Sequence, residues 1–174
     1  MLILVFQKNT MTIIGQLQGF FIMIRKFKKE DLPQILELCR EVRQHHIDLL
    51  GGYFNEQNDE YETSAFMETL ENDNVVVLVD ENEGKLNGYL LGEFKELPYL
   101  LNPKIAHIGN FGVSKNQRGL GIGKQLMDAF FKLCQERNVK EIRLGVYNQN
   151  EIAYKFYENY GFVPLEQKMV FNLD

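Results

Sequence analysis

Residues 110–124, NFGVSKNQRGLGIGK, limit the folds open to this chain more than any other stretch. Gly119, Gly121 and Gly123 follow Arg118 at every second position, and apolar residues at helical spacing begin at once. Glycine lacks the Cβ atom that would keep a ligand away from the backbone. The first N–H groups of a helix have no internal partner and lie at the positive end of its dipole. The pattern of strand, glycine turn and helix therefore predicts a phosphate site.

Two better-known phosphate motifs do not fit these residues. A P-loop would need a glycine where Arg118 stands and a hydroxyl where Gln125 stands. In a dinucleotide fingerprint the third glycine would come one residue later than Gly123. Glu141, at the distance of the ribose-binding acid, opens the next predicted strand instead of ending it. A glycine-rich turn without a ligand remains as the alternative.

The order Arg118-x-x-Gly121-x-Gly123 after a strand resembles the acetyl-CoA signature of the GNAT superfamily of N-acetyltransferases. The likeness continues in residues 144–162, LGVYNQNEIAYKFYENYGF, with the family's later pattern of a strand, a helix and Gly-Phe. Two motifs at the expected separation are more specific than either one alone. The resemblance covers residues 22–174, and residues 1–21 stand before it as an extension.

The resemblance implies a single α/β domain with a mixed, mostly antiparallel twisted sheet flanked by about four helices. The sequence pattern places the elements as follows: strands at 22–27, 75–79, 86–94, 105–113 and 141–147, helices at 32–50, 62–70, 122–137 and from Asn150 to Gly161, and a closing hairpin of 162–165 with 169–173. Gly109 and Gly112 inside one strand indicate a bulge or a close backbone approach.

The resemblance also implies acetyl-CoA as co-substrate. The backbone of the glycine turn would bind the pyrophosphate, the strand before it would pair with pantetheine, and Asn150 would bind pantetheine or cap its helix. The residues expected to bind the cofactor are Phe111, Gly112, Val113, Arg118, Gly119, Leu120, Gly121, Ile122, Gly123, Lys124 and Asn150.

Tyr157 stands where the family's motif places the general acid. A phenol with a pKa of about 10 is protonated at neutral pH and can donate to the leaving sulfur. Family members often carry a glutamate base on the strand before the turn, but residues 106–110 hold no acid. His107 is our candidate base, with Glu93 and a chain of water molecules as alternatives.

The irregular acidic stretch 53–62 would help to wall the acceptor site in such a family. Tyr53, Glu60, His46 and Glu93 are the candidates for holding an amine, and a solvated loop is the competing interpretation. We expect no metal, since adjacent histidines such as His45 and His46 do not face the same way on a helix.

The net charge of −5 argues against binding to nucleic acid and suits a cationic acceptor. Cys39 and Cys134 form no CxxC motif and fit buried free thiols in a reducing, cytoplasmic compartment. Residues 1–21 contain neither an apolar run long enough to span a membrane nor the pattern of a signal peptide. They fit a start site placed upstream of the true one, or an extension docked on the body or on a second subunit.

These features predict an acetyl-CoA-dependent N-acetyltransferase. An amine of a small molecule or a protein would attack the thioester directly in a ternary complex. The alternative is a relative that binds CoA without catalysis and acts as a sensor or an interaction protein. The apolar ends of the chain are compatible with a homodimer.

Overall fold

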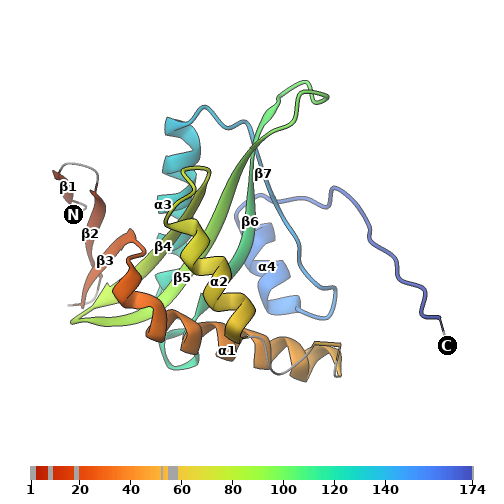
Figure 1. Cartoon of the computed structure of the whole chain (residues 1–174), viewed down its shortest axis with the longest axis horizontal. Helices are drawn as coiled ribbons and strands as arrows, with labels where there is room; N and C mark the ends of the chain where they lie inside the picture. Colours follow the sequence, from red (N-terminus) through yellow and green to blue (C-terminus); the bar gives the residue numbers. More distant parts are fainter. Residues whose placement is uncertain (1–2, 8–9, 18–19, 52, 55–58, 174) are drawn as a thin grey trace.

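The computed structural model describes residues 3–7, 10–17, 20–51, 53–54 and 59–173. These residues form one seven-stranded sheet in the order β1-β2-β3-β4-β5-β6-β7, with helices on both faces (Figure 1). Every neighbouring pair is antiparallel except β6 with β7, which confirms the expected mixed, mostly antiparallel sheet. The elements are β1 (Ile3–Gln7), β2 (Thr10–Leu17), β3 (Phe20–Lys26), α1 (Leu32–Leu50), α2 (Asp59–Thr69), β4 (Val75–Asn82), β5 (Lys85–Glu96), β6 (Lys104–Val113), α3 (Ile122–Glu136), β7 (Glu141–Leu144) and α4 (Glu151–Asn159).

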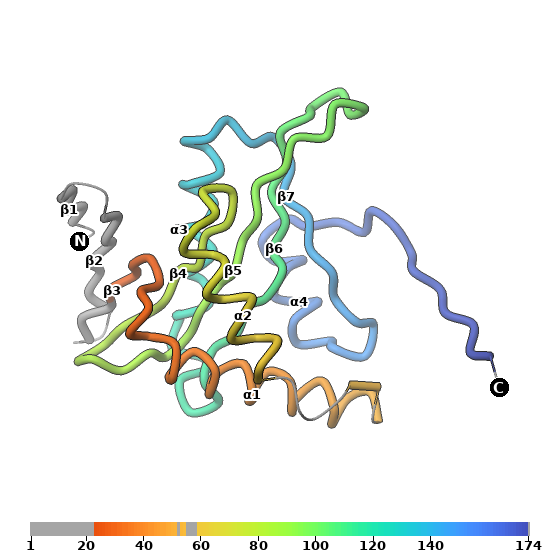
Figure 2. The backbone as a smooth tube through the Cα atoms, in the orientation of Figure 1, coloured from red at the N-terminus to blue at the C-terminus, as the bar shows by residue number. Residues whose placement is uncertain are grey.

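The last two strands stay together for only part of their length. Pairing of β6 with β7 runs from Ile105 opposite Glu141 to Ile108 opposite Leu144. Beyond these residues the chain leaving β7 swings away from β6, as the tube in Figure 2 shows. We call the opening between residues 109–113 of β6 and residues 145–147 the splay.

A β-bulge lies at the base of the splay. Leu91 of β5 is opposite Asn110, whereas the next residue, Gly92, is opposite Ile108. Gly109 is therefore the extra residue on β6, which confirms the bulge predicted from the sequence. Because side chains alternate along a strand, the bulge also decides which face Asn110 occupies.

Each face of the sheet has its own apolar core. The core under α3 is built around Leu126 and Phe130, and the core under α1 and α2 around Ile35 and Tyr89. Two strand glycines allow the helices to approach. A Cβ atom at Gly112 would lie 2.4 Å from Val42 Cγ2 of α1.

The helix boundaries follow local signals closely. α1 ends where Gly51 adopts a left-handed φ of 61°, as the glycine pair predicted. α2 begins at Asp59, three residues before the predicted start, because the acidic residues of its first turn suit a helix N-terminus. α3 starts at Ile122 and Asn150 precedes α4, both as predicted.

The predicted closing hairpin is wrong. Residues 162–173 form no strand and run outward from the body as an extended segment, which Figure 1 shows at the C-terminal end. Apolar alternation produces a strand only where a partner strand is present to pair with it. Six large apolar side chains of the segment are 68–91% exposed: Val163, Leu165, Met169, Val170, Phe171 and Leu173.

Two smaller differences concern the sheet edges. β7 ends at Leu144 and not at Tyr147, since its partner β6 provides no ladder beyond Ile108. At the other edge, the described backbone of residues 3–7 and 10–17 forms β1 and β2, which extend the sheet beyond β3.

The domain boundary at residue 22 stays a prediction. Among the described residues, no helix is both long enough and apolar enough to cross a membrane.

The close packing of α3 on β5 leads to a stability prediction. A Cβ atom at Gly92 would lie 2.1 Å from Cε2 and 2.5 Å from Cζ of Phe130, a fully buried ring. We expect Gly92→Ala to lower the free energy of unfolding by about 1–3 kcal/mol, the usual cost of overpacking a core. Urea denaturation measures this. Gly145→Ala is the matched control, because no atom lies within 4 Å of its added Cβ. Equal stability of the two variants would contradict the packing described here.

Candidate active site

The glycine turn holds a row of backbone N–H groups at the start of α3. Gly119 and Gly121 have φ values of 79° and 83°, in the left-handed region that favours glycine. The first helical hydrogen bond runs from the Gln125 N–H to the Gly121 carbonyl (3.1 Å). The N–H groups of residues 122–124 come before this bond, so the helix gives them no partner. The turn therefore has the anion-binding geometry that the sequence predicted.

Side chains anchor this turn on both sides. Arg118 Nε donates to the Val113 carbonyl (3.1 Å), which fixes the turn against the end of β6. Tyr160, the residue that follows α4, donates its hydroxyl to the Lys124 carbonyl (2.9 Å). Lys124 Nζ forms an ion pair with Asp128 (2.8 Å), so part of the positive charge expected of Lys124 is already balanced. Arg118 is exposed and remains the stronger candidate to meet a phosphate.

The individual side chains of the turn divide between solvent and core. Leu120 is 48% exposed, whereas Ile122 is buried in the core under α3 and offers a ligand only its backbone. A Cβ atom at Gly123 would lie 3.3 Å from Cζ of Phe111 and 3.6 Å from Cζ of Phe156. The start of α3 therefore contacts both β6 and α4. These contacts bring the glycine turn close to the splay and to the second sequence motif, residues 144–162.

The free edge of β6 provides further backbone donors. Ser114 N–H donates to the Asn87 carbonyl of β5 (2.8 Å). Because the hydrogen-bonding direction alternates along a strand, the N–H of Gly112 also points toward β5. The N–H groups of Phe111 and Val113 point the other way, into the splay. In the stretch predicted to pair with a cofactor, the N–H groups of every second residue are therefore directed away from β5.

Tyr157 lies on α4 beside this edge. Its ring contacts Phe111, Phe156 and Phe162 at centroid distances of 6.4, 5.5 and 5.8 Å. Burial raises the pKa of the Tyr157 phenol to about 12, so the hydroxyl keeps its proton throughout the physiological range. Asn150 caps the same helix, since its Oδ1 accepts from the Ala153 N–H (3.2 Å).

The candidate base lies deeper in the sheet. His107 is opposite Glu93 on one side and Arg143 on the other, where β6 is still paired with both neighbours. Burial lowers the pKa of His107, with further lowering by Lys95, so the imidazole is neutral at neutral pH. Phe111 comes four positions after His107, about 13 Å along an extended strand. Glu93, the alternative base, forms an ion pair with Lys95 (2.7 Å).

Two of the four predicted acceptor residues belong to one group of rings. His46, near the end of α1, contacts Phe54 (5.6 Å) and Tyr147 (5.7 Å). Tyr53 contacts Phe54 (5.3 Å) and Tyr147 (6.3 Å). We call these four residues the aromatic cluster. Of the other two candidates, Glu93 lies on β5, and Glu60 is exposed in the first turn of α2.

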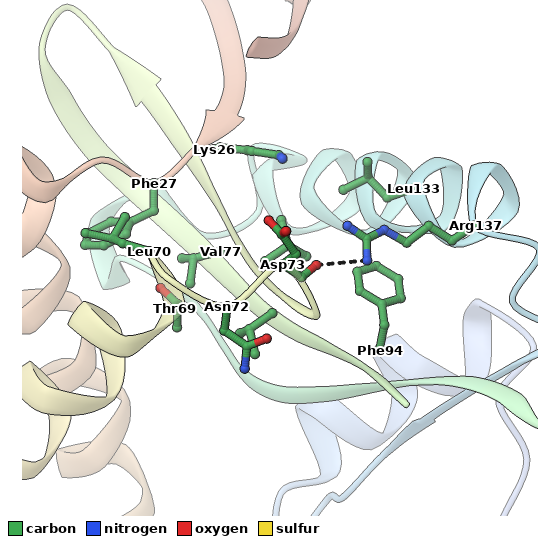
Figure 3. Close-up of a pocket in the computed structure, with 12 residues that line it drawn as sticks. Lys26, Phe27, Thr69, Leu70, Asn72, Asp73, Val77, Phe94, Leu133 and Arg137 are labelled. Atoms are coloured by element: carbon green, nitrogen blue, oxygen red, sulfur yellow. Dashed lines mark hydrogen bonds between the residues drawn. The ribbon is translucent and has the colours of Figure 1, made fainter. Parts of the chain in front are cut away.

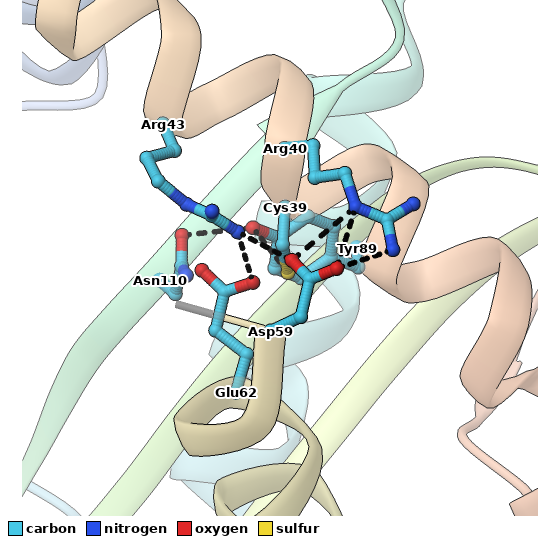
Figure 4. Close-up of polar contacts among 7 residues, drawn as sticks. All are labelled: Cys39, Arg40, Arg43, Asp59, Glu62, Tyr89 and Asn110. Carbon is cyan, nitrogen blue, oxygen red and sulfur yellow. Dashed lines mark hydrogen bonds and ion pairs between the residues drawn. The ribbon is translucent and has the colours of Figure 1, made fainter. Parts of the chain in front are cut away.

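A polar network that joins α1, α2 and the sheet was not found by sequence reasoning (Figure 4). The buried Tyr89 hydroxyl accepts from Cys39 Sγ (3.3 Å) and donates to Asn110 Oδ1 (2.9 Å). Arg43 Nη2 pairs with Glu62 (2.7 Å) and Asp59 (3.1 Å). No local pattern signals these contacts, because the partners come from α1, α2, β5 and β6. Asn110 faces α1 and α2 only because of the Gly109 bulge.

One cavity lies away from all of these residues. A cavity of about 220 Å³ is lined by Phe27, Asp73, Phe94 and Arg137, among others (Figure 3). Arg137 donates to the Asp73 carbonyl (3.0 Å) and packs over the Phe94 ring (4.1 Å). Arg137 follows the C-terminal end of α3, the opposite end from the glycine turn. None of the predicted site residues lines this cavity, and within the described part of the chain no group of histidine, cysteine and acidic side chains gathers as a metal site.

Comparison with known proteins decides the family. The model of the acetyltransferase (GNAT) family matches residues 37–162, which contain the glycine turn, both sides of the splay and α4. The chain belongs to the GNAT acetyltransferase family. The resemblance found in the two sequence motifs is thereby confirmed, together with the fold it implied.

GNAT relatives in the comparison are N-acetyltransferases. The chain is 30% identical over 147 residues to an N-alpha-acetyltransferase of Sulfurisphaera tokodaii, covering 80% of this chain and 78% of the relative. It is 26% identical over 149 residues to a spermidine N(1)-acetyltransferase of Thermoplasma acidophilum, covering 81% of this chain and 88% of the relative.

Solved structures share the same arrangement. A tetramutant protein of Bacillus halodurans superposes with a TM-score of 0.79 at 27% identity, covering 86% of this chain and 99% of that one. A predicted acetyltransferase of Clostridium acetobutylicum, solved with acetyl-CoA, superposes with a TM-score of 0.70 at 22% identity. It covers 87% of this chain and 96% of that one, a likeness of fold alone.

The glycine turn yields a direct prediction. In Gly121→Asp a carboxylate would stand before the free N–H groups of α3, in a left-handed conformation that L side chains rarely adopt. We expect CoA to bind at least about tenfold more weakly, because like charges would meet at the diphosphate. Titration calorimetry measures the affinity. Gly84→Asp is the control, since Gly84 has a similar φ of 80° in the β4–β5 turn. If both variants bind CoA equally well, the turn does not hold the diphosphate.

Proposed function

We propose that this protein is an acetyl-CoA-dependent N-acetyltransferase that acetylates a primary amine of a small molecule or a protein. The observation that carries the proposal is the contact between three features: the free N–H groups of residues 122–124, the open edge of β6, and Tyr157 on α4. The similarity to an N-alpha-acetyltransferase and to a spermidine N(1)-acetyltransferase supports an amine as acceptor.

The cofactor would use backbone groups for most of its contacts. Its diphosphate would accept from the N–H groups at the start of α3, with Arg118 adding positive charge. Pantetheine would lie along the splay as an added strand against the free edge of β6, where Phe111 and Val113 present their N–H groups. This arrangement would bring the thioester to the bulge at Gly109.

The transfer would proceed by direct attack. The neutral amine nitrogen forms a bond to the thioester carbon, and the carbonyl oxygen takes negative charge that the Phe111 N–H can stabilise. The C–S bond then breaks, the sulfur leaves as a thiolate, and Tyr157 donates its proton to that sulfur. The attacking nitrogen loses one proton to water, Tyr157 regains one proton from water, and the products are the acetylated amine and CoA.

His107 would accept the amine proton through water molecules and not by direct contact with the amine. A neutral imidazole accepts a proton, and the lowered pKa of His107 keeps it neutral at pH 7. With about 13 Å of strand between His107 and Phe111, the proton would pass through water and not by direct contact. The same separation, together with the lack of an acid in residues 106–110, favours as second candidate a GNAT-fold protein that binds CoA without catalysis.

Tyr157→Phe distinguishes the two functions. We expect turnover to fall by about a hundredfold, the usual contribution of a general acid, with acetyl-CoA affinity unchanged. Because the pKa of Tyr157 is about 12, the wild-type enzyme should keep this donor up to about pH 10. Thiol release at saturating substrate measures turnover. Tyr154→Phe, on the same helix but more exposed, is the control. Equal turnover in both variants would remove Tyr157 from the mechanism.

We also propose that the protein forms a homodimer through its C-terminal segment. The six exposed apolar side chains between Val163 and Leu173 form a contact surface of a kind that monomers rarely leave open.

Sedimentation velocity tests the dimer. We expect the wild type to sediment as a dimer and the double variant Met169→Glu, Phe171→Glu as a monomer, because the new carboxylates could not be buried. Lys168→Glu, which changes the exposed polar residue just before them, should leave the dimer intact. A monomeric wild type at micromolar concentration would refute the proposal.

A further inference from the structure

The aromatic cluster lies across the splay on the face opposite the glycine turn. Val42 of α1 packs against Gly112 of β6, and His46 follows one helical turn later on the same side of α1. Tyr147 stands three residues after the end of β7, on the other side of the splay. The contact of the His46 and Tyr147 rings (5.7 Å) therefore joins the two diverging segments on the α1 face. Figure 1 shows the end of α1 beside the loop that leads into α4.

The aromatic cluster is also linked to α4 by hydrogen bonds. The Asn150 N–H donates to the Tyr147 carbonyl (2.8 Å), and Asn150 in turn caps the helix that carries Tyr157. Tyr147 is thus tied to the element that holds the candidate acid. A thioester entering the splay from the α3 face would present its acetyl group toward the α1 face, where these rings lie.

The rings are available to a ligand. Tyr53 is 64% exposed and Tyr147 39% exposed, although each contacts two or more other rings. Exposed aromatic groups gathered in one place are typical of binding surfaces. Tyrosine and phenylalanine give a large apolar contact area with few rotatable bonds.

Two acids of α2 have their charge balanced by arginines of α1. Asp59 and Glu62 are paired with Arg40 and Arg43 (Figure 4), so these two acids add little net negative charge. On α1, Glu41 accepts from the Lys115 N–H (2.8 Å) and Asp48 accepts from Gln44 (2.8 Å). Burial and the neighbouring His45 lower the pKa of His46, so this ring is neutral at neutral pH.

We propose that the aromatic cluster binds a large apolar or aromatic group next to the acceptor amine. This inference rests on the proposed N-acetyltransferase function and narrows its acceptor. The preferred acceptors carry one primary amine a few bonds from such a group, either as a free arylalkylamine or as a peptide N-terminus with an aromatic side chain. We expect polyamines to be poorer acceptors than these, because Asp59 and Glu62 are already paired with arginines.

An acceptor panel tests this specificity and its source. Acetyl transfer is compared for 2-phenylethylamine against ethylamine, for the peptide Phe-Gly-Gly against Gly-Gly-Gly, and for spermidine. We expect the aromatic member of at least one pair to have the higher kcat/KM, and the better pair identifies a free amine or a peptide as the source. Preference for spermidine, or equal rates within both pairs, would overturn the inference while leaving the acetyltransferase function intact.

A variant pair locates the specificity in the aromatic cluster. We expect Tyr147→Ala to raise the KM for the preferred aromatic acceptor about three- to tenfold, the value of one aromatic contact, with the KM for acetyl-CoA unchanged. Tyr99→Ala is the control, since Tyr99 is 78% exposed in the loop between β5 and β6. Equal KM values for the two variants would contradict the assignment.

A binding measurement separates this inference from the proposed chemistry. Saturation-transfer NMR with CoA-loaded protein should show contact with 2-phenylethylamine or Phe-Gly-Gly that Tyr147→Ala weakens and Tyr99→Ala does not. If that contact is found without any acetyl transfer, the catalytic proposal fails and the aromatic site stands. If no aromatic ligand binds, the aromatic site is refuted whether or not other amines are acetylated.

Discussion

The structure depends on a row of backbone N–H groups that the start of α3 cannot satisfy by itself. Two left-handed glycines, Gly119 and Gly121, bring the chain from β6 into the helix so sharply that these donors face outward. Arg118 ties the turn to the end of β6, and Tyr160 ties α4 to the first turn of α3. An anion held here is held at a fixed distance from the strand edge and from Tyr157, which is what acyl transfer from a long cofactor requires.

The second constraint is the parting of β6 from β7. Pairing stops at Ile108 and Leu144, and the chemistry beside the two diverging segments differs between the faces of the sheet. The α3 face offers backbone donors and positive charge, whereas the α1 face offers aromatic rings and a polar network ending at Asn110. Separation of an anion site from an acceptor site by the sheet itself accounts for how both substrates could be bound at once.

The sequence predicted those parts of the fold that local physics determines. Glycine spacing located the turn, Gly51 ended α1, and Gly109 marked the bulge, because each depends on a few neighbouring residues. The errors lie where long-range contacts decide. The 162–173 hairpin and the end of β7 depend on partner strands that no local pattern reveals, and Tyr147 joins its ring partners from about 90 residues away along the chain. Two rings of the aromatic cluster were nevertheless named as candidates, Tyr53 because loops on a rigid scaffold often carry recognition and His46 from its place near the end of the first helix.

The central claim is that the amides at the start of α3 bind the diphosphate of CoA, and an NMR titration tests it most directly. With ¹⁵N-labelled protein, addition of CoA should shift the amide resonances of Ile122, Gly123 and Lys124 in proportion to occupancy. The amides of Asn72 and Asp73, beside the cavity at the far end of α3, should not move. Shifts confined to that cavity, or saturation without change at residues 122–124, would contradict the account.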